Sequence, residues 1–148
     1  MNKKIGSYQS AETIGKSQID LILKVYDGAV SSLESARRAY ADECLTDGRE
    51  QMERARRFVT HLYTTLNMEK GGEVAENLEK LYAYVISQSY AVQATKDLAS
   101  IADMISILDN LRAGWRGLRQ QQAENRGNPG EENREPAEAG VTEFVTTA

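Results

Sequence analysis

The sequence predicts an all-α protein, an antiparallel up-down four-helix bundle, and three observations support that fold class. Apolar residues recur at spacings of three and four over four separate stretches, which is the period of one helix face. Both prolines, Pro129 and Pro136, lie beyond residue 120, so the stretch before them contains none of the residues that break helices most strongly. The breaks between the four stretches are short, and short connections make neighbouring helices antiparallel.

The first helix is expected to follow a short N-terminal segment, residues 1–16. Ser17 followed by Asp20 resembles an N-cap with an acidic residue at the capping-box position, so the helix is predicted to begin at Ser17. Residues 42–46 interrupt the apolar pattern and end this helix. Its apolar face consists of Ile19, Ile22, Tyr26, Ala29, Leu33, Ala36 and Tyr40.

The second helix is expected to start near Asp47, which offers another cap together with Glu50. It leads into residues 66–78, where Gly71 and Gly72 separate two amphipathic stretches. Because glycine adopts the left-handed backbone that stops a helix, the second helix is predicted to end at this pair. Glu73 then places negative charge on the next helix's first turn, where the macrodipole favours it. The second face consists of Met52, Ala55, Val59, Leu62, Tyr63 and Leu66.

The third helix follows the glycine pair, and an interruption around residues 95–97 separates it from the fourth. The bundle is therefore predicted to span residues 17–120. The third face consists of Val74, Leu78, Leu81, Tyr82, Val85 and Val92, and the fourth of Ile101, Met104, Leu108, Leu111, Trp115 and Leu118.

Residues 121–148 are expected to form a disordered acidic tail, because they carry Pro, Gly, Glu and Asn with few apolar groups. From residue 120 onward there are six acidic and two basic residues, which leaves 16 of each sign before it. The bundle thus has no net positive charge, which argues against nucleic-acid binding. A local group of arginines alternates with Glu50 and Glu53, and the alternation predicts a solvated face with i,i+4 ion pairs. The group consists of Arg49, Arg54, Arg56 and Arg57.

The residues that enzymes and metal sites need are scarce. His61 is the only histidine and Cys44 the only cysteine, too few for a zinc site or a carboxylate-bridged metal site. The Gly-Lys-Ser of residues 15–17 lacks the glycine five positions earlier that a phosphate-binding loop requires, because that position is Ser10. We therefore predict no enzyme activity, no metal and no cofactor.

The sequence also predicts where the protein works. It has no run of about 18 consecutive apolar residues, so membrane insertion is not expected. The two lysines near the N-terminus have no apolar run behind them and do not form a secretory signal. A single cysteine rules out an internal disulfide and is typical of the reducing cytoplasm. We expect a cytoplasmic protein.

Glycines and tyrosines point to binding. Gly28 lies inside the first helix, and it serves either close helix packing or a groove for a partner's backbone; the two interpretations are equally weighted. For Gly114 and Gly117, near Trp115, the packing interpretation is favoured. There are seven tyrosines against two phenylalanines, and an aromatic ring with a polar tip suits a surface that a partner covers. These features favour a bundle with apolar surface grooves that receive an amphipathic helix.

Three segments resemble those of a known family, the flagellar secretion chaperones (FliS family). Residues 25–29, Val-Tyr-Asp-Gly-Ala, are similar to its Tyr-Asp-Gly-Ala segment in the first long helix. Residues 66–78 resemble its Leu-Asn-x-Glu-x-Gly-Gly-Glu-x-Ala-x-Asn-Leu turn. Residues 111–115, Leu-Arg-Ala-Gly-Trp, are similar to the motif that closes its last helix. In order and spacing the resemblance covers roughly residues 8–120.

The resemblance implies an antiparallel bundle without catalysis. Family members bind the disordered C-terminal region of flagellin in the cytoplasm, prevent premature polymerisation and deliver the subunit to the flagellar export apparatus. An alternative keeps the bundle as an adaptor that binds another flagellar regulator or associates with itself as a homodimer. The expected partner-binding residues are Ile5 and Tyr8 as an N-terminal cover of the groove, Tyr26, Asp27 and Gly28 on the first helix, and Tyr82 and Tyr84 on the third.

Overall fold

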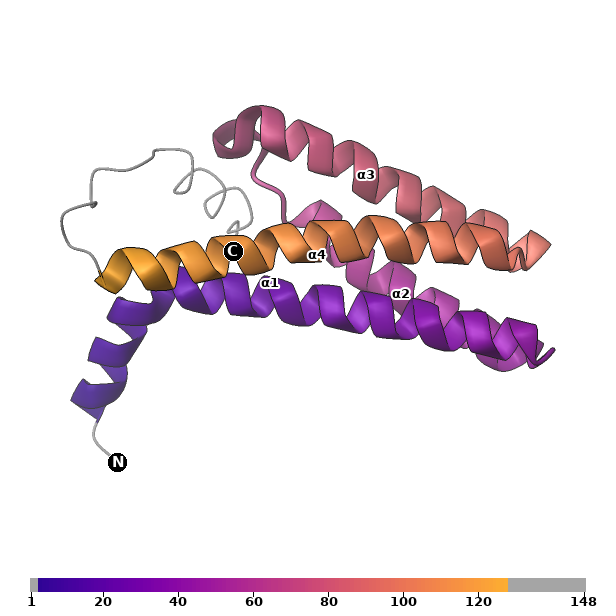
Figure 1. Ribbon diagram of the computed structural model, residues 1–148, viewed down its shortest axis with the longest axis horizontal. Coiled ribbons are helices and arrows are strands. Elements are labelled where there is room, and N and C mark those ends of the chain that lie inside the picture. The colour runs from indigo at the N-terminus through magenta and orange to yellow at the C-terminus, as the bar shows by residue number, and fades with distance from the viewer. Residues whose placement is uncertain (1–2, 128–148) are drawn as a thin grey trace.

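The computed structural model describes residues 3–127, and it describes side chains for residues 18–125. The chain forms four helices, α1 (Lys3–Ala41), α2 (Leu45–Thr64), α3 (Met68–Thr95) and α4 (Leu98–Gly127). They are joined by short turns and alternate in direction (Figure 1). Residues 3–127 contain no strand, so the predicted all-α, antiparallel up-down bundle is confirmed.

The helices are not packed equally. α1 packs along α2 and along α4, α3 rests mainly on α2, and the contact between α3 and α4 is the least extensive of these four. In Figure 1, α3 and α4 meet where one ends and the other begins, and they diverge toward the opposite end of the bundle. Buried apolar side chains from all four helices form one core; its largest members with almost no exposure are Tyr26, Tyr82, Ile19, Leu33, Met52, Ile101, Met104 and Leu108.

Two predicted helix starts are wrong. α1 begins at Lys3 and not at Ser17, because residues 3–16 contain no proline and the backbone continues as a helix through the expected cap. In Figure 1 the first turns of α1 point away from the bundle. α2 begins with Cys44 at the N-cap position and without a side-chain cap, so Asp47 lies inside the first turn. At this position the negative charge of its carboxylate still interacts favourably with the positive end of the helix dipole.

The end of α2 also differs from the prediction. α2 stops at Thr64, well before the glycine pair. Asn67 caps α3, and its side chain accepts a hydrogen bond from the Lys70 backbone N–H at 3.1 Å. A single turn follows, and then Gly72 breaks the helical backbone with φ 55° and ψ −134°. Positive φ is thus confined to the second glycine of the pair, and it produces a kink inside α3.

α4 continues to Gly127, so residues 121–127 are helical although they were expected to belong to the acidic tail. The expected tail from residue 128 onward lies outside the described residues. Val74 is another difference, because it falls on the predicted core face of α3 but is 45% exposed. Its exposure fits the divergence of α3 from α4 at this end of the bundle.

Candidate functional site

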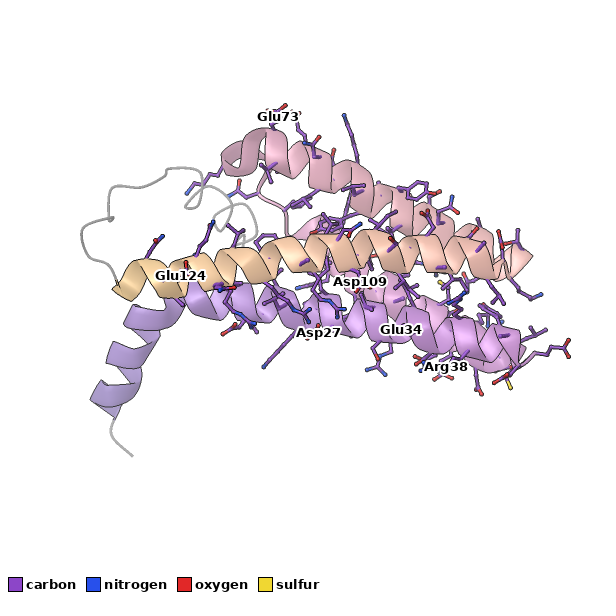
Figure 2. The ribbon with its side chains drawn as sticks, viewed as in Figure 1. Asp27, Glu34, Arg38, Glu73, Asp109 and Glu124 are labelled. Atoms are coloured by element: carbon purple, nitrogen blue, oxygen red, sulfur yellow. The ribbon has the colours of Figure 1, made fainter. Side chains whose placement is uncertain are left out.

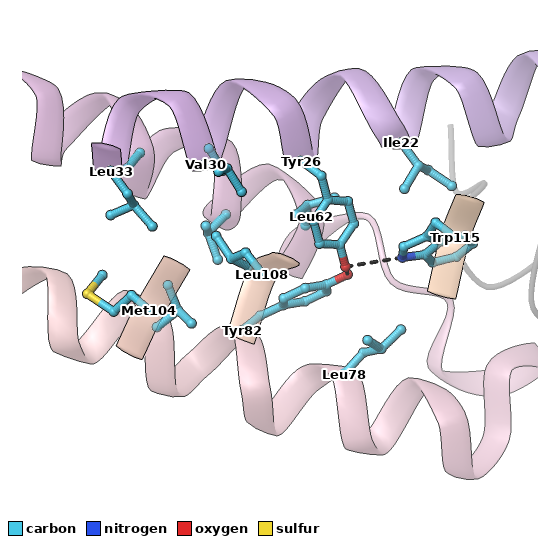
Figure 3. Close-up of a cluster of buried hydrophobic side chains, with 14 of the residues drawn as sticks. Ile22, Tyr26, Val30, Leu33, Leu62, Leu78, Tyr82, Met104, Leu108 and Trp115 are labelled. Carbon is cyan, nitrogen blue, oxygen red and sulfur yellow. Dashed lines mark hydrogen bonds between the residues drawn. The ribbon is translucent and has the colours of Figure 1, made fainter. Parts of the chain in front are cut away.

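A buried pair of tyrosines connects three helices. Tyr26 on α1 and Tyr82 on α3 are both completely buried, and their hydroxyls lie 2.5 Å apart. Trp115 on α4 donates its indole N–H to the Tyr26 hydroxyl at 3.1 Å. Figure 3 shows the three side chains meeting among Leu62, Leu78 and other core residues. The polar tips of these aromatic rings are therefore paired inside the bundle, as buried polar groups need to be.

Burial also fixes the protonation state of this pair. Removal from water raises the pKa of the Tyr26 hydroxyl to about 12, although hydrogen bonds from Tyr82 and Trp115 oppose the shift. Burial raises the pKa of Tyr82 still further, and the neighbouring Tyr26 adds to the effect. Both hydroxyls stay neutral at physiological pH, because a phenolate is strongly disfavoured without water. The pair thus acts as a structural cluster and not as an acid or base.

The site prediction placed Tyr26 and Tyr82 in a surface groove, whereas the structure places them in the core. A partner reaches their side chains only if α3 moves away from α1 and α4, so their role in binding stays a prediction. Tyr84 is different, because 43% of it is exposed. Its hydroxyl donates to the Asp103 carboxylate on α4 at 3.2 Å, and the Asp103 carboxylate raises the pKa of Tyr84. Tyr84 therefore marks the flank of α3 that faces α4.

Asp27 lies at the junction of α1 and α4, where Figure 2 shows it on the outside of the bundle near Asp109. One oxygen of its carboxylate lies 2.9 Å from Arg112 and 3.8 Å from Arg116. Asp109 approaches Arg112 at 2.6 Å from the same helix. This predicted groove residue is therefore engaged in ion pairs that hold α1 to α4.

The surroundings of Gly28 decide between the packing interpretation and the groove interpretation. A Cβ added at Gly28 would lie 2.5 to 2.8 Å from three atoms of the Phe58 ring on α2. Gly28 therefore permits close approach of α1 and α2, which is the packing interpretation. Gly114 and Gly117 show the opposite, because an added Cβ would have no neighbour within 4 Å. The packing interpretation for these two glycines is wrong.

Ile5 and Tyr8 fall in the first turns of α1, and their side chains lie outside the described residues. Their role as an N-terminal cover stays a prediction. In Figure 1 the backbone of this part of α1 runs away from the bundle and not along it.

The least closed surface lies between α3 and α4. The Tyr84–Asp103 hydrogen bond identifies the flanks that face each other, and residues three or four positions away continue each flank. The apolar side chains on both flanks are half-buried, and Gly114 leaves open space beside them. We call this surface the α3–α4 seam; it consists of Leu81 and Tyr84 on α3 and of Asp103, Ile107, Leu111, Gly114 and Leu118 on α4.

Sequence reasoning missed this surface. It assigned Leu81, Leu111 and Leu118 to the core faces of their helices and did not single out Ile107 at all. The available signal was their place at the margins of the apolar stripes, about 40–100° from the centre of the core face at 100° per residue. A margin residue becomes a surface residue when the neighbouring helix diverges, and the sequence does not show that divergence.

Within residues 3–127, no group of three or more His, Cys, Asp or Glu side chains is arranged to hold a metal ion. His61 is exposed on α2. None of the helices in this range is long and apolar enough to span a membrane. The described residues thus offer helix surfaces as the candidate site.

Comparison with known proteins gives consistent matches. Residues 1–122 match the family described as flagellar protein FliS. The chain is 31% identical over 113 residues to the flagellar secretion chaperone FliS of Salmonella typhimurium, which covers 76% of this chain and 83% of the relative. It is 28% identical over 98 residues to the flagellar secretion chaperone FliSB of Pseudomonas aeruginosa, and this match covers 66% of this chain and 78% of the relative. It is 26% identical over 88 residues to the flagellar secretion chaperone FliS of Vibrio cholerae, and this match covers 60% of this chain and 65% of the relative.

Proposed function

This chain belongs to the FliS family of flagellar proteins, and from that premise we propose that it binds the C-terminal region of flagellin. Bound in this way, flagellin is kept from premature polymerisation and is delivered to the flagellar export apparatus from the cytoplasm. The family is one of secretion chaperones and not of enzymes. The chain is accordingly a flagellar chaperone, and the proposal concerns which client segment it takes and where.

The observation that carries the proposal is the α3–α4 seam. Its half-buried apolar side chains and the open space at Gly114 lie along two helices that diverge. An amphipathic helix placed there would cover apolar surface that the bundle leaves partly wet. A client segment without fixed structure loses conformational entropy when it folds onto such a surface, and burial of its apolar face offsets that cost.

The N-terminal cover belongs to the same proposal. Ile5 and Tyr8 would occupy part of the client surface while flagellin is absent and leave it when flagellin binds. The resemblance to the family supports this role. A crosslink between the first turns of α1 and α3 should then reduce flagellin binding, whereas removal of both side chains should increase the association rate.

The direct test is binding of a peptide from the C-terminal region of flagellin, measured by calorimetry and by far-ultraviolet circular dichroism. We expect a one-to-one complex and additional helical signal. Gly114→Leu fills the open space in the seam, so it should weaken binding about tenfold or more, which corresponds to ~1.4 kcal/mol. Because a Cβ added at this position has no neighbour within 4 Å, we expect the variant to fold as the unchanged chain does.

Gly117→Leu is the matched control. It makes the same change on the same helix, and it lies on the outward side of the α3-facing flank. A Cβ added there also has no neighbour within 4 Å. Binding should stay near the level of the unchanged chain. Equal weakening by both variants would place the client elsewhere, and no complex at about 50 μM peptide, far above the micromolar Kd scale of a specific contact, would reject the function. Light scattering without peptide would reveal self-association instead.

A further inference from the structure

A hollow of about 390 Å³ opens between α2 and α3, on the flank of α3 that faces away from the α3–α4 seam. Tyr84 marks the seam flank of α3, whereas Tyr90 lines the hollow. Tyr90 is 59% exposed, which is unusual for a large aromatic side chain. The hollow is lined by Glu53, Arg56, Arg57, Thr60 and Tyr90.

Most polar groups around the hollow already have partners. The Arg56 guanidinium donates to the Ser89 hydroxyl at 2.7 Å and to the Gln93 side-chain oxygen, and it lies 3.7 Å from the Tyr90 ring centroid. Glu53 accepts a hydrogen bond from Gln93 at 3.5 Å. Arg57 is left with no carboxylate within 4 Å among residues 18–125. The hollow thus presents an uncompensated guanidinium beside an exposed aromatic ring.

This imbalance extends along α2. The ion pairs described for residues 18–125 join α4 arginines to Asp20, Asp27 and Asp109, and none involves α2. The i,i+4 pairs predicted for the arginines of α2 are therefore not formed, and that prediction is wrong. Complementary charge follows in the same chain, because residues 128–148 contain five glutamates and one arginine.

We propose that residues 141–145 of the chain, Val-Thr-Glu-Phe-Val, dock in this hollow. The Glu143 carboxylate pairs with the Arg57 guanidinium, and the Phe144 ring packs against Tyr90. Of the residues beyond α4, Phe144 is the only aromatic one, and it directly follows a carboxylate. The occupant therefore offers the two groups that the hollow accepts, in adjacent positions.

The segment can reach the hollow. Arg119 pairs with Asp20, and Gly28 lies against Phe58 beside the hollow, so the end of α4 is about 24 Å along the bundle from it at 1.5 Å per residue. Crossing two helices adds about 20 Å sideways, which gives a span of roughly 30 Å. The 14 residues from Gly127 to Val141 extend to at most ~46 Å. A tether of this kind also raises the local concentration of the segment to the order of millimolar, so a weak contact is substantially occupied.

The test uses the full chain and contains no flagellin, so its outcome is independent of the proposed function. Exposed Cys44 is changed to serine, and Ala148→Cys carries a nitroxide spin label. We expect amide signals of residues 53–60 and 86–93 to lose at least about half their intensity, because the label is then held near them. Reduction of the nitroxide should restore these signals.

Arg57→Glu should remove at least about half of this broadening, because it places like charges opposite each other, and Phe144→Ala should act in the same direction. Arg37→Glu is the matched control, since Arg37 is an exposed arginine on α1 that does not line the hollow, and it should leave the broadening unchanged. No broadening at the hollow, or equal loss with Arg37→Glu, would overturn the proposal. A second experiment mixes ¹⁵N-labelled chains that carry no spin label with unlabelled chains that carry it. Broadening at the hollow in this mixture would also overturn the proposal, because the segment would then dock on another copy of the chain.

Discussion

The two flanks of α4 are built differently. On the flank toward α1, ion pairs join the two helices at the surface: Asp27 lies 2.9 Å from Arg112, and Asp20 lies 3.4 Å from Arg119. Toward α3 the surface contact is the Tyr84–Asp103 hydrogen bond at 3.2 Å, and the apolar side chains around it stay half exposed. One helix thus combines a completed interface with an incomplete one. The incomplete interface is where a partner helix gains most from binding, because apolar surface there is still partly in water.

The largest expected effect concerns the buried tyrosines that hold α3 to α1 and α4. The pKa of Tyr26 is raised to about 12 in the folded chain from 10.0 as the ordinary value. A raised pKa means that the folded state favours the protonated form. The stabilisation is therefore complete below pH 10 and is lost as the pH rises from 10 toward 12. For Tyr26 alone the loss is on the order of 3 kcal/mol, and Tyr82 shifts in the same direction.

Urea unfolding at pH 9 and pH 11.5 measures part of this loss, about 2 kcal/mol for Tyr26 alone. The control is the double variant Tyr26→Phe and Tyr82→Phe, which keeps every lysine and the other tyrosines. Its stability should fall much less over the same interval. A fall of equal size in both proteins would mean that α3 is not held by a neutral tyrosine pair.

The second prediction compares the tight α1–α2 contact at Gly28 with the open α3–α4 seam at Gly114. Gly28→Leu pushes a side chain into the Phe58 ring, so it should lower the free energy of unfolding by about 1–3 kcal/mol. At Gly114 in the seam an added Cβ has no neighbour within 4 Å, so Gly114→Leu should raise the free energy of unfolding by up to about 1 kcal/mol through helix propensity. Denaturant unfolding of both variants gives the two signs. The same sign in both would contradict the proposed difference in packing between the α1–α2 contact and the α3–α4 seam.

The sequence predicted the helices well because their apolar stripes follow the 3.6-residue period without a break. Ile19 to Tyr40 and Ile101 to Trp115 were assigned to the core, and these two runs are buried apart from the half-exposed Leu111. Helix ends were less predictable. Local signals such as Ser17 or Asp47 offer caps, but a cap is used only where the backbone turns, and tertiary packing decides that.

The site was harder to predict than the fold. Tyr26 and Tyr82 lie on the predicted apolar faces of their helices, but they were also assigned to the partner groove because tyrosine has a polar tip. In the structure a second tyrosine and Trp115 satisfy that tip inside the core. A helical stripe cannot say which polar group pairs with which across helices. Gly114 was singled out in the sequence but assigned to close helix packing, whereas an added Cβ there has no neighbour within 4 Å. Open space beside a residue depends on three-dimensional packing, which the sequence does not show.

The third prediction concerns the buried tyrosine pair, which joins α3 to α1. Tyr82→Phe removes one hydroxyl of the buried pair, whereas Tyr26 keeps the hydrogen bond from Trp115. The expected loss of stability is about 1 kcal/mol. Amide exchange in α3 should accelerate about fivefold. Exchange in α1 should accelerate less, because α1 is held by two other helices. Equal acceleration in α1 and α3 would show that α3 is as firmly packed as the rest.

The smallest expected effect compares the two flanks of α4 directly. Asp27→Asn removes the charge that pairs with Arg112 and Arg116, but Asp109 still accompanies Arg112. Exposed ion pairs contribute about 0.2–1 kcal/mol, so the loss should lie in that range at low salt. It should shrink in about 0.5 M salt, where screening acts over a few ångströms.

Tyr84→Phe on the other flank removes the hydrogen bond to Asp103 without removing a charge. Its effect on thermal unfolding should be smaller than that of Asp27→Asn and independent of salt, because the lost hydroxyl is neutral and the exposed Asp103 carboxylate can bond to water in its place. The difference between the two variants then measures how much more α1 than α3 restrains α4. If Tyr84→Phe costs as much as Asp27→Asn, the α3–α4 seam is closed by its own hydrogen bond, and an entering client helix must first break that bond.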